Sequence, residues 1–278
     1  VALRACPGGA TCDEDDVADS LLWCYNNRNT YNISVVTMSL GFDNGDGQCG
    51  TNWANPEIDL LYNAGITLIA SSGNNDDEDE IHYPACNDKV IAVGATYDFG
   101  NGSQEVDWCK EVNGGTLLFG ACWLGELGIL PFSCADYPAV DNIACFTNRG
   151  PELDLLAPGC WITASGPAYC GTSQAAPHVA GAVALLRQKK SDLTPLSVKN
   201  ILQTTGDSVG SWKRIDVDAA LDSIPTACSC SSWSFSGGCG TGGCNSQQRP
   251  QTRSCTPDVC QSETQCVYDE SCVGGEGN

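Results

Sequence analysis

A serine stands between a glycine-led turn and a run of small apolar residues. Gly171 and Thr172 precede Ser173, and residues 175–186 are mainly alanine, valine and leucine. A run this apolar is typical of a buried helix, so a helix is predicted to begin at the serine. The serine could simply cap that helix. The same position, where a loop becomes a buried helix, would also hold the nucleophile of a hydrolase.

The segments around this serine alternate between strand-like and helix-like patterns. Apolar runs at 1–6, 33–39 and 66–71 predict strands, whereas residues 17–25 and 57–63 carry helical spacing or helix-end signals. Strands connected by helices of this length need right-handed crossovers. The sequence therefore predicts an α/β fold with a doubly wound parallel sheet, flanking helices, and a site at the carboxyl ends of the strands.

Five stretches together resemble the subtilisin-like serine proteases, also called subtilases or peptidase family S8. They are GTSQAAPHVAG at 171–181, VTMSLG at 36–41, LIASSGN at 68–74, YPA at 83–85 with VIAVGA at 90–95, and PELDLLAPG at 151–159. They occur in the order that the family requires. The resemblance implies a protease-like domain at 1–224, interrupted by one insertion at 97–146.

The resemblance implies catalytic roles for two residues. Ser173 would be the nucleophile, and Asn74 would be the side-chain donor to the oxyanion, since a neutral amide brings no charge into a dry site. The backbone N–H of Ser173, at the start of the helix, would be the second donor. Without the resemblance, Asn74 would be an ordinary turn residue after Gly73.

The same resemblance implies a polypeptide substrate that binds as an added strand. The residues that it assigns to substrate binding are Ser39, Leu40, Gly41, Ser71, Ser72, Gly73 and His82. The acidic run 76–80 lies between them in the chain. It would favour a basic substrate residue, or it would be a solvated loop or a calcium-binding cluster.

The chain has no candidate for the general base. It contains two histidines, His82 and His178; in the family their counterparts border the specificity pocket and pack in the central helix. The family's chain order is aspartate, histidine, serine. We therefore expect both missing residues on a piece of the same precursor upstream of Val1, which stays docked after cleavage. An unpaired cysteine would suit a disulfide between the two pieces.

The resemblance also implies a structural cation, calcium or sodium. Asp154 would supply the carboxylate, and the backbone carbonyls of Ala85, Asn87 and Val90 would complete the site. Such ions bind several oxygen ligands at once.

The composition indicates the cellular compartment of the protein and excludes one class of binding partner. The formal net charge of −21 argues against nucleic acid, whose phosphates require a basic surface. The 19 cysteines, with sequons at Asn32 and Asn101, predict a secreted protein with disulfide bonds. No uncharged apolar run reaches the ~18 residues of a membrane-spanning helix. An odd cysteine count leaves at least one thiol unpaired in this chain, and we expect it within 1–224.

Residues 97–146 are longer than the connection that the family has at this place. The segment contains Cys109, Cys122, Cys134 and Cys145. Unstructured loops of this length are uncommon inside a domain, so we expect a disulfide-stapled subdomain. Its apolar residues at 117–130 would contact either a protein partner or the domain's own core.

The last segment, 227–278, has a different composition, with eight cysteines and much glycine and serine. Its Trp233, Arg249 and Arg253 resemble the stacked tryptophans and arginines of a thrombospondin type 1 repeat. A full ladder of three tryptophans cannot form, because Trp233 is the only one available. The alternative is an unrelated small disulfide-rich module.

Together these features predict an extracellular serine endopeptidase of the subtilisin-like class. The alternative is a non-catalytic structural or protein-binding protein on a protease-like fold. The sequence upstream of Val1 would separate the two.

Overall fold

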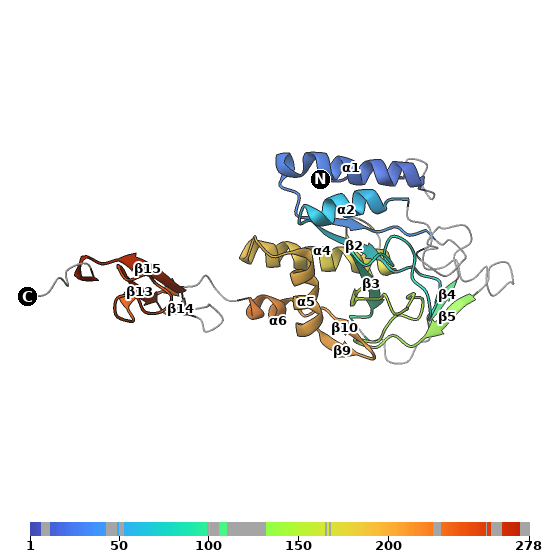
Figure 1. The fold of residues 1–278 in the computed structure, drawn as a ribbon. Helices are drawn as coiled ribbons and strands as arrows, with labels where there is room; N and C mark the ends of the chain where they lie inside the picture. The colour runs from blue at the N-terminus through green and yellow to red at the C-terminus, as the bar shows by residue number, and fades with distance from the viewer. Residues whose placement is uncertain are drawn as a thin grey trace, which may run out of the picture. The chain divides into compact units, whose positions relative to one another are not determined.

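The computed structural model forms two compact units, Val1–Ser223 and Ile224–Asn278 (Figure 1). It describes residues 1–6, 12–42, 49, 53–98, 100, 106–109, 132–164, 166, 168–224, 229–253, 255–256 and 263–272.

The first unit is built on a six-stranded sheet. Its strands, in spatial order, are β1 (Val35–Met38), β2 (Thr67–Ser71), β3 (Val90–Thr96), β6 (Leu155–Pro158), β10 (Trp212–Arg214) and β9 (Asp207–Val209). The first five run parallel and β9 runs antiparallel to β10. β2 and β3 are buried along their whole length, as expected for strands covered on both faces. The predicted parallel α/β architecture is confirmed.

Helices flank this sheet. They are α1 (Glu14–Tyr31), α2 (Asn55–Asn63), α4 (Thr172–Lys189), α5 (Pro195–Thr205) and α6 (Val217–Ser223). The Asp13 side chain caps α1 by accepting from Asp15 N–H, and three acidic residues follow in the first turn, where they suit the helix dipole. The Thr194 hydroxyl caps α5 by accepting from Ser197 N–H. These local signals explain where the two helices begin.

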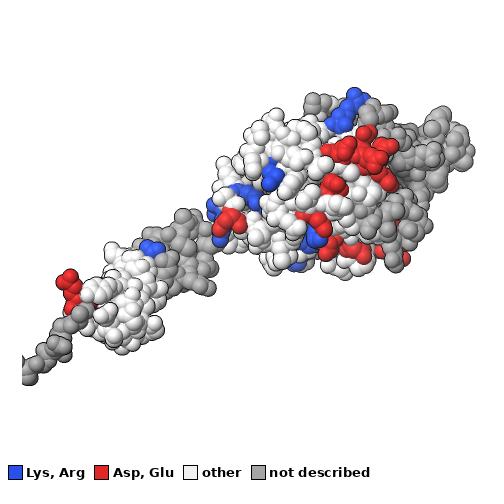
Figure 2. Space-filling model, turned by 45° about the horizontal axis from the view of Figure 1, so that its top comes forward, with Lys and Arg blue, Asp and Glu red and all other residues white. Residues whose placement is uncertain are grey.

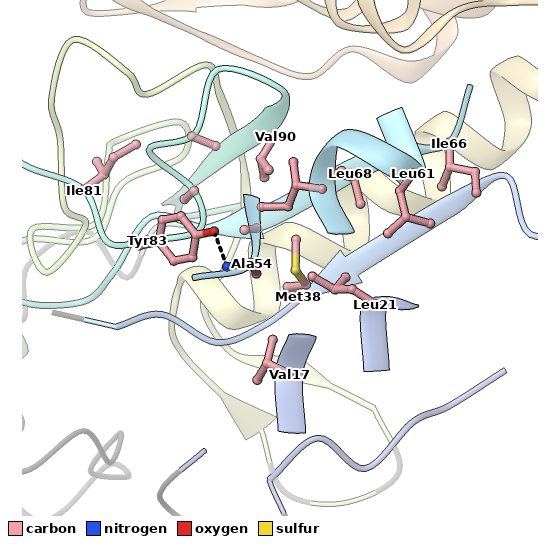
Figure 3. Close-up of a cluster of buried hydrophobic side chains, with 14 of the residues drawn as sticks. Val17, Leu21, Met38, Ala54, Leu61, Ile66, Leu68, Ile81, Tyr83 and Val90 are labelled. Atoms are coloured by element: carbon pink, nitrogen blue, oxygen red, sulfur yellow. Dashed lines mark hydrogen bonds between the residues drawn. The ribbon is translucent and has the colours of Figure 1, made fainter. Parts of the chain in front are cut away.

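Side chains that alternate along each strand pack against helices on opposite faces of the sheet. Leu68 of β2 and Met38 of β1 belong to one apolar cluster with Val17 and Leu21 of α1 (Figure 3). Successive strand side chains point to opposite faces, so Ile69 faces the other side of the sheet. α4 contacts β1, β2, β3 and β6. The helix that carries the candidate nucleophile is thus fixed against four strands.

The prediction of a strand at residues 1–6 is wrong. These residues have no regular secondary structure and no strand pairing, and Val1 and Leu3 are 80% and 39% exposed. A strand exists only through a neighbour, and among the described strands β1 pairs with β2 alone. Val1, Leu3, Ala5 and Cys6 instead line a cavity of about 450 Å³ together with residues of α1 and β1.

The free cysteine among the described residues is Cys24, which lies within 1–224 as expected. It is 8% exposed and packs in the cluster beside α1. Burial raises the pKa of its thiol. Because thiolates, not thiols, exchange with disulfides, Cys24 is poorly suited to a disulfide tether between two pieces of a precursor.

Of the insertion at 97–146, the structure describes two ends. They contain the antiparallel pair β4 (Val106–Cys109) and β5 (Phe132–Asp136) and the disulfide Cys134–Cys145. The apolar residues at 117–130 lie outside the described residues. In the part of the chain that is described, no helix is long and apolar enough to cross a membrane. Aspartate and glutamate side chains gather on the first unit, in keeping with the net charge (Figure 2).

The second unit contains β11 (Ser229–Cys230), β12 (Ser234–Phe235), β13 (Gln248–Arg253), β14 (Cys255–Thr256) and β15 (Glu263–Tyr268). β12, β13 and β15 form an antiparallel sheet, and β11 pairs with β14. Disulfides Cys239–Cys272 and Cys244–Cys266 link its segments. So small a unit depends on such links, because its core is too small to stabilise it alone.

Candidate active site

Ser173 is the second residue of α4. Its backbone N–H therefore belongs to the first turn, whose N–H groups lack intrahelical acceptors. Gly171 precedes the helix with φ of 153°, a conformation that side chains disfavour, and a Cβ atom there would lie 2.9 Å from Gln174 Oε1. The disulfide Cys160–Cys170 and the bond from Gly171 N–H to the Gly159 carbonyl, at 2.8 Å, hold the approach to the helix.

Asn74 lies beside the start of the same helix. Its Oδ1 accepts two hydrogen bonds from Thr172, one from the backbone N–H at 2.8 Å and one from the hydroxyl at 2.9 Å. The amide is thereby oriented, because Oδ1 is committed to Thr172 and Nδ2 is left as the donor end. The structure brings Asn74 and Ser173 to one place, although 98 residues separate Asn74 from its hydrogen-bond partner.

The hydroxyl of Ser173 faces the segment that follows β1. Its Oγ donates to the Ser39 carbonyl at 3.4 Å, and the Ser39 hydroxyl donates to the Ser173 carbonyl at 2.8 Å. The first bond is long and therefore weak. The nucleophile candidate thus lies directly beside the segment assigned to the substrate, with its hydroxyl loosely held.

The described partner of the Ser173 hydroxyl is the Ser39 carbonyl, and the described contacts of the two histidines lie elsewhere. His178 lies in α4, and its Nδ1 is 2.9 Å from the Gln174 carbonyl one turn earlier, as in an ordinary packed helix. The backbone N–H of His82 donates to the Ser72 carbonyl at 2.9 Å. No described contact gives Ser173 a general base.

Two segments, 39–41 and 71–73, lie beside each other near Ser173. The Ser71 hydroxyl donates to the Leu40 carbonyl at 3.3 Å, which joins them. Ser71 and Ser72 are buried, whereas Ser39 and Gly41 are exposed. The assignment of 39–41 to substrate binding stays a prediction, and the Ser72 side chain is covered.

The acidic run 76–80 is largely engaged in its own loop. Arg149 Nη2 lies 2.8 Å from Glu78 Oε1 and 3.4 Å from Asp76 Oδ1. Asp77 Oδ1 accepts from two backbone N–H groups of the same run. Three of its five carboxylates are thus held by contacts within this part of the domain.

The residues assigned to a cation lie in the turn before β3 and at the start of β6. Ala85 is buried, and the Asn87 carbonyl accepts from Val90 N–H at 2.9 Å. The Asn87 side chain donates to Asn55 Oδ1 at 2.8 Å. In the described residues, no group of three or more His, Cys, Asp or Glu side chains is placed to hold a metal ion.

The carboxylate of Asp154 already has a cationic partner. Lys199 Nζ of α5 lies 2.6 Å from Oδ1, and Ala92 N–H donates to Oδ2 at 3.1 Å. Burial raises the pKa of Asp154, and Lys199 and the Ala92 N–H oppose that rise. A hard cation needs several oxygens free for it, so these residues do not fit calcium or sodium as they are arranged. The ion stays a prediction that requires Lys199 to move away.

We expect Lys199→Met to expose this competition. Asp154, with a side chain only 11% exposed, would lose its counter-ion, and its pKa would rise further. A carboxyl whose pKa is raised on folding contributes stability that is present at acid pH and is lost as pH rises through the folded pKa. Unfolding in urea should therefore show a loss of about 1–3 kcal/mol at pH 7 that shrinks as the pH is lowered toward that pKa.

The effect of calcium on the melting temperature is a second measurement on the Lys199→Met protein. With Lys199 removed, added calcium should raise the melting temperature more than it does in the unaltered chain, and Asp154→Ala in the same background should cancel the difference. Lys89→Met, which breaks the more exposed pair with Asp59, is the matched control and should change neither response. Equal calcium responses in all four proteins would contradict a cation site at Asp154.

Three residues of this region were missed by sequence reasoning. Thr172 orients Asn74, Asn148 accepts from the backbone N–H groups of Asn75 and Asp77, and Lys199 pairs with Asp154. Thr172 stood inside the serine motif and could have been noted. The other two lie 45 or more residues from their partners, and no local pattern announces such contacts.

The family model for peptidase S8, described as the subtilase family, matches residues 2–224. Subtilisin DY of Bacillus licheniformis is 31% identical over 186 residues, which cover 64% of this chain and 51% of the relative. The subtilisin of Bacillus pumilus is 29% identical, and the match covers 70% of this chain and 56% of the relative. An extracellular protease of Xanthomonas campestris is 27% identical, covering 82% and 31%. The chain spans about half the length of the subtilisins that it matches.

Solved structures show a similar fold. The prenylagaramide maturation protease PagA superimposes with a TM-score of 0.54 at 22% identity, covering 77% of this chain and 69% of the other. The self-cleaved protease domain of PatA gives 0.52 at 22% identity, covering 76% and 67%. At this identity the likeness concerns the fold alone.

Proposed function

Because the chain belongs to the subtilase family, we propose that it carries the nucleophile and the oxyanion hole of a secreted serine endopeptidase. Ser173 is the nucleophile, and Asn74 with the Ser173 backbone N–H forms the oxyanion hole. The observation that carries this proposal is the pair of hydrogen bonds from Thr172 to Asn74 Oδ1. They support the proposal because they hold the Asn74 side chain beside the N-terminus of the helix that contains Ser173.

The reaction follows from these positions. Ser173 Oγ attacks the carbonyl carbon of the substrate while a histidine accepts its proton, and the tetrahedral oxyanion receives hydrogen bonds from Asn74 Nδ2 and the Ser173 N–H. The histidine then gives the proton to the leaving amine. Water hydrolyses the acyl-enzyme by the same steps and restores the free serine.

The histidine and its aspartate belong, in this proposal, to an upstream piece of the same precursor. Support comes from the free edge of β1, which pairs with β2 alone among the described strands. Beside this edge lies the cavity of about 450 Å³, whose lining includes Leu3, Val36 and Leu40. An edge that no described strand pairs with is suited to receive another strand, and β1 leads to Ser39, which contacts Ser173.

The substrate is proposed to pair with residues 39–41, whose exposed backbone follows β1. A substrate added as a strand here would bring the carbonyl group of its scissile bond close to Ser173, because Ser173 is hydrogen-bonded to Ser39. A polypeptide in extended conformation is therefore the substrate class.

The second unit is proposed to be a variant thrombospondin type 1 module. The guanidinium of Arg253 lies 4.7 Å from the ring centre of Trp233, and that of Arg249 lies 4.3 Å from the ring centre of Phe235. These are two cation–π layers, with phenylalanine in the place where a second tryptophan would stand. The spacing supports a layered module of this type, although the tryptophan ladder is incomplete.

A fluorophosphonate probe tests the enzyme proposal. The full chain, co-produced with its upstream precursor segment, should be labelled at Ser173 because the histidine activates the hydroxyl. The chain without that segment should be labelled far more slowly. If the upstream sequence contains neither residue and Ser173 stays unlabelled, the protein is a non-catalytic, protein-binding member of the family.

A further inference from the structure

We propose that Asn32 carries an N-linked glycan. This inference goes beyond the proposed function, because Asn32 lies at the opposite end of β1 from Ser39 and the modification does not depend on the reaction at Ser173. The triplet Asn32-Ile33-Ser34 suggests the site. The conformation and exposure of Asn32, and an aromatic surface beside it, carry the inference further.

Asn32 ends helix α1 in a left-handed conformation, with φ of 51° and ψ of 48°. Backbone groups alone close the helix, since the N–H groups of Asn32 and Ile33 both donate to the Arg28 carbonyl, the second at 2.8 Å. Asparagine tolerates this conformation, but glycine is the usual residue at such a helix end. The asparagine side chain is therefore not required to end the helix.

The Asn32 side chain is exposed and has no structural task among the described residues. Within that part of the chain, neither its amide nor the Ser34 hydroxyl has a hydrogen-bond partner. The triplet's backbone is fixed at both ends, because the Ser34 carbonyl accepts from Thr67 N–H of β2 at 3.1 Å. A glycan on Asn32 Nδ2 would thus displace no described contact.

The modification transfers an oligosaccharide from a lipid diphosphate to the asparagine amide. A bond forms between Asn32 Nδ2 and the anomeric carbon of the first sugar, and the bond from that carbon to the phosphate oxygen breaks. The lipid diphosphate leaves, and the amide gives up one proton. This transfer takes place in the secretory pathway, whose oxidising conditions also form disulfides such as Cys6–Cys12.

Two aromatic rings lie at the end of α1 beside the modified residue. Tyr31 immediately precedes Asn32 and is 53% exposed. Its ring stacks on that of Trp23, with 5.5 Å between the ring centres and 28° between the planes. The face of an aromatic ring carries partial negative charge and attracts the C–H groups of a sugar. We expect the first sugar on Asn32 to pack on Tyr31 and to cover apolar surface that otherwise contacts water.

The attachment point is far from the candidate active site. Asn32 precedes β1 and Ser39 follows it, and seven residues of nearly extended chain span about 20 Å. Tyr31, Asn32 and Ser34 contribute to the lining of the cavity beside β1. Removal of the glycan is therefore expected to leave fluorophosphonate labelling of Ser173 unchanged.

The first test uses protein isolated from its native source. Peptide-N-glycosidase converts a glycosylated asparagine to aspartate, and mass spectrometry of the peptide that contains residue 32 should show this conversion. An Asn32 that is unmodified before enzyme treatment would overturn the inference. It would leave the proposed function standing, since that function is tested by the labelling of Ser173.

Variants of the full chain, secreted from eukaryotic cells with its upstream segment, test the triplet. Ser34→Ala keeps Asn32 and should remove its glycan, whereas Ser34→Thr is the matched control and should retain it. Asn101→Gln, which removes the other triplet, should leave the glycan on Asn32 in place. A glycan that persists on Asn32 in Ser34→Ala would overturn the assignment to this triplet.

The melting temperature tests the packing on Tyr31. Enzymatic removal of the glycan should lower it by about 2–4 °C, the shift expected for one favourable contact in a domain of this size. Tyr31→Ala should reduce that shift by half or more. Tyr268→Ala, which removes a tyrosine of similar exposure, 58%, from the second unit, is the matched control and should retain it. Equal shifts in all three proteins would overturn the packing of the sugar on Tyr31.

Discussion

Ser173→Ala is expected to lower kcat for peptide hydrolysis by about 10⁶-fold, the order of loss known for the nucleophile of a subtilisin. The side chain lost is small and half-buried at the start of α4, and alanine favours helix, so the fold should be unaffected. The measurement is single-turnover cleavage of a peptide by the full chain with its upstream segment, accompanied by loss of fluorophosphonate labelling.

Ser191→Ala is the matched control, because this exposed serine lies just beyond the other end of the same helix. Its kcat and labelling should equal those of the unaltered protein. If Ser173→Ala kept measurable acyl-enzyme formation, another residue would be the nucleophile. If it lowered kcat only a few-fold, the proposed covalent route would be wrong.

Much of the architecture could be predicted from the sequence because its signals are local. The apolar runs around 33–39 and 66–71 became β1 and β2, and the helix predicted at 57–63 begins two residues earlier, at Asn55. Proline near the start of α2 and the cap at Thr194 are visible in the sequence without any tertiary contact. Parallel order then followed from the alternation of strands and helices.

The strand prediction at 1–6 failed for a different reason. Apolar alternation shows that a segment can pair, but pairing depends on hydrogen bonds to a neighbouring strand, and none of the described strands pairs with these residues. The site shows the same limit. The bonds from Thr172 to Asn74 and from Asn75 to Asn148 span 98 and 73 residues, so they become visible only when the chain is folded.

Asp154 illustrates how a residue can be found and its partner missed. The carboxylate was recognised from the stretch at 151–159, and a cation was expected beside it. The structure supplies the ammonium of Lys199 at 2.6 Å from α5. The motif predicts that a carboxylate lies at this point of the fold. Which residue pairs with that carboxylate depends on the tertiary packing of distant elements such as α5.

Asn74→Leu is expected to lower kcat by about 10²- to 10³-fold with little change in KM, the loss known for the same donor in a subtilisin. The reason is that Nδ2 would bond an oxyanion that exists only in the transition state, so substrate binding is unaffected. Steady-state hydrolysis of one peptide by the full chain with its upstream segment provides both constants. Asn75→Leu, one residue on, is the matched control for a polar-to-apolar change in this loop.

Thr172→Val tests whether Thr172 acts by orienting the Asn74 amide, as distinct from the hydrogen bond that Asn74 itself would donate to the oxyanion. The variant keeps the bond from the Thr172 backbone N–H to Asn74 Oδ1 but loses the hydroxyl, which donates to Asn74 Oδ1 at 2.9 Å and accepts from Gly73 N–H at a longer 3.3 Å. One hydrogen bond of about 1 kcal/mol corresponds to a several-fold loss in kcat, far less than for Asn74→Leu. In the Asn74→Leu background the same change should have no further effect on kcat, since no amide remains to be oriented. Additive losses in the double variant would show that Thr172 acts independently of Asn74, and an unaltered kcat in Asn74→Leu would remove the asparagine from the oxyanion hole.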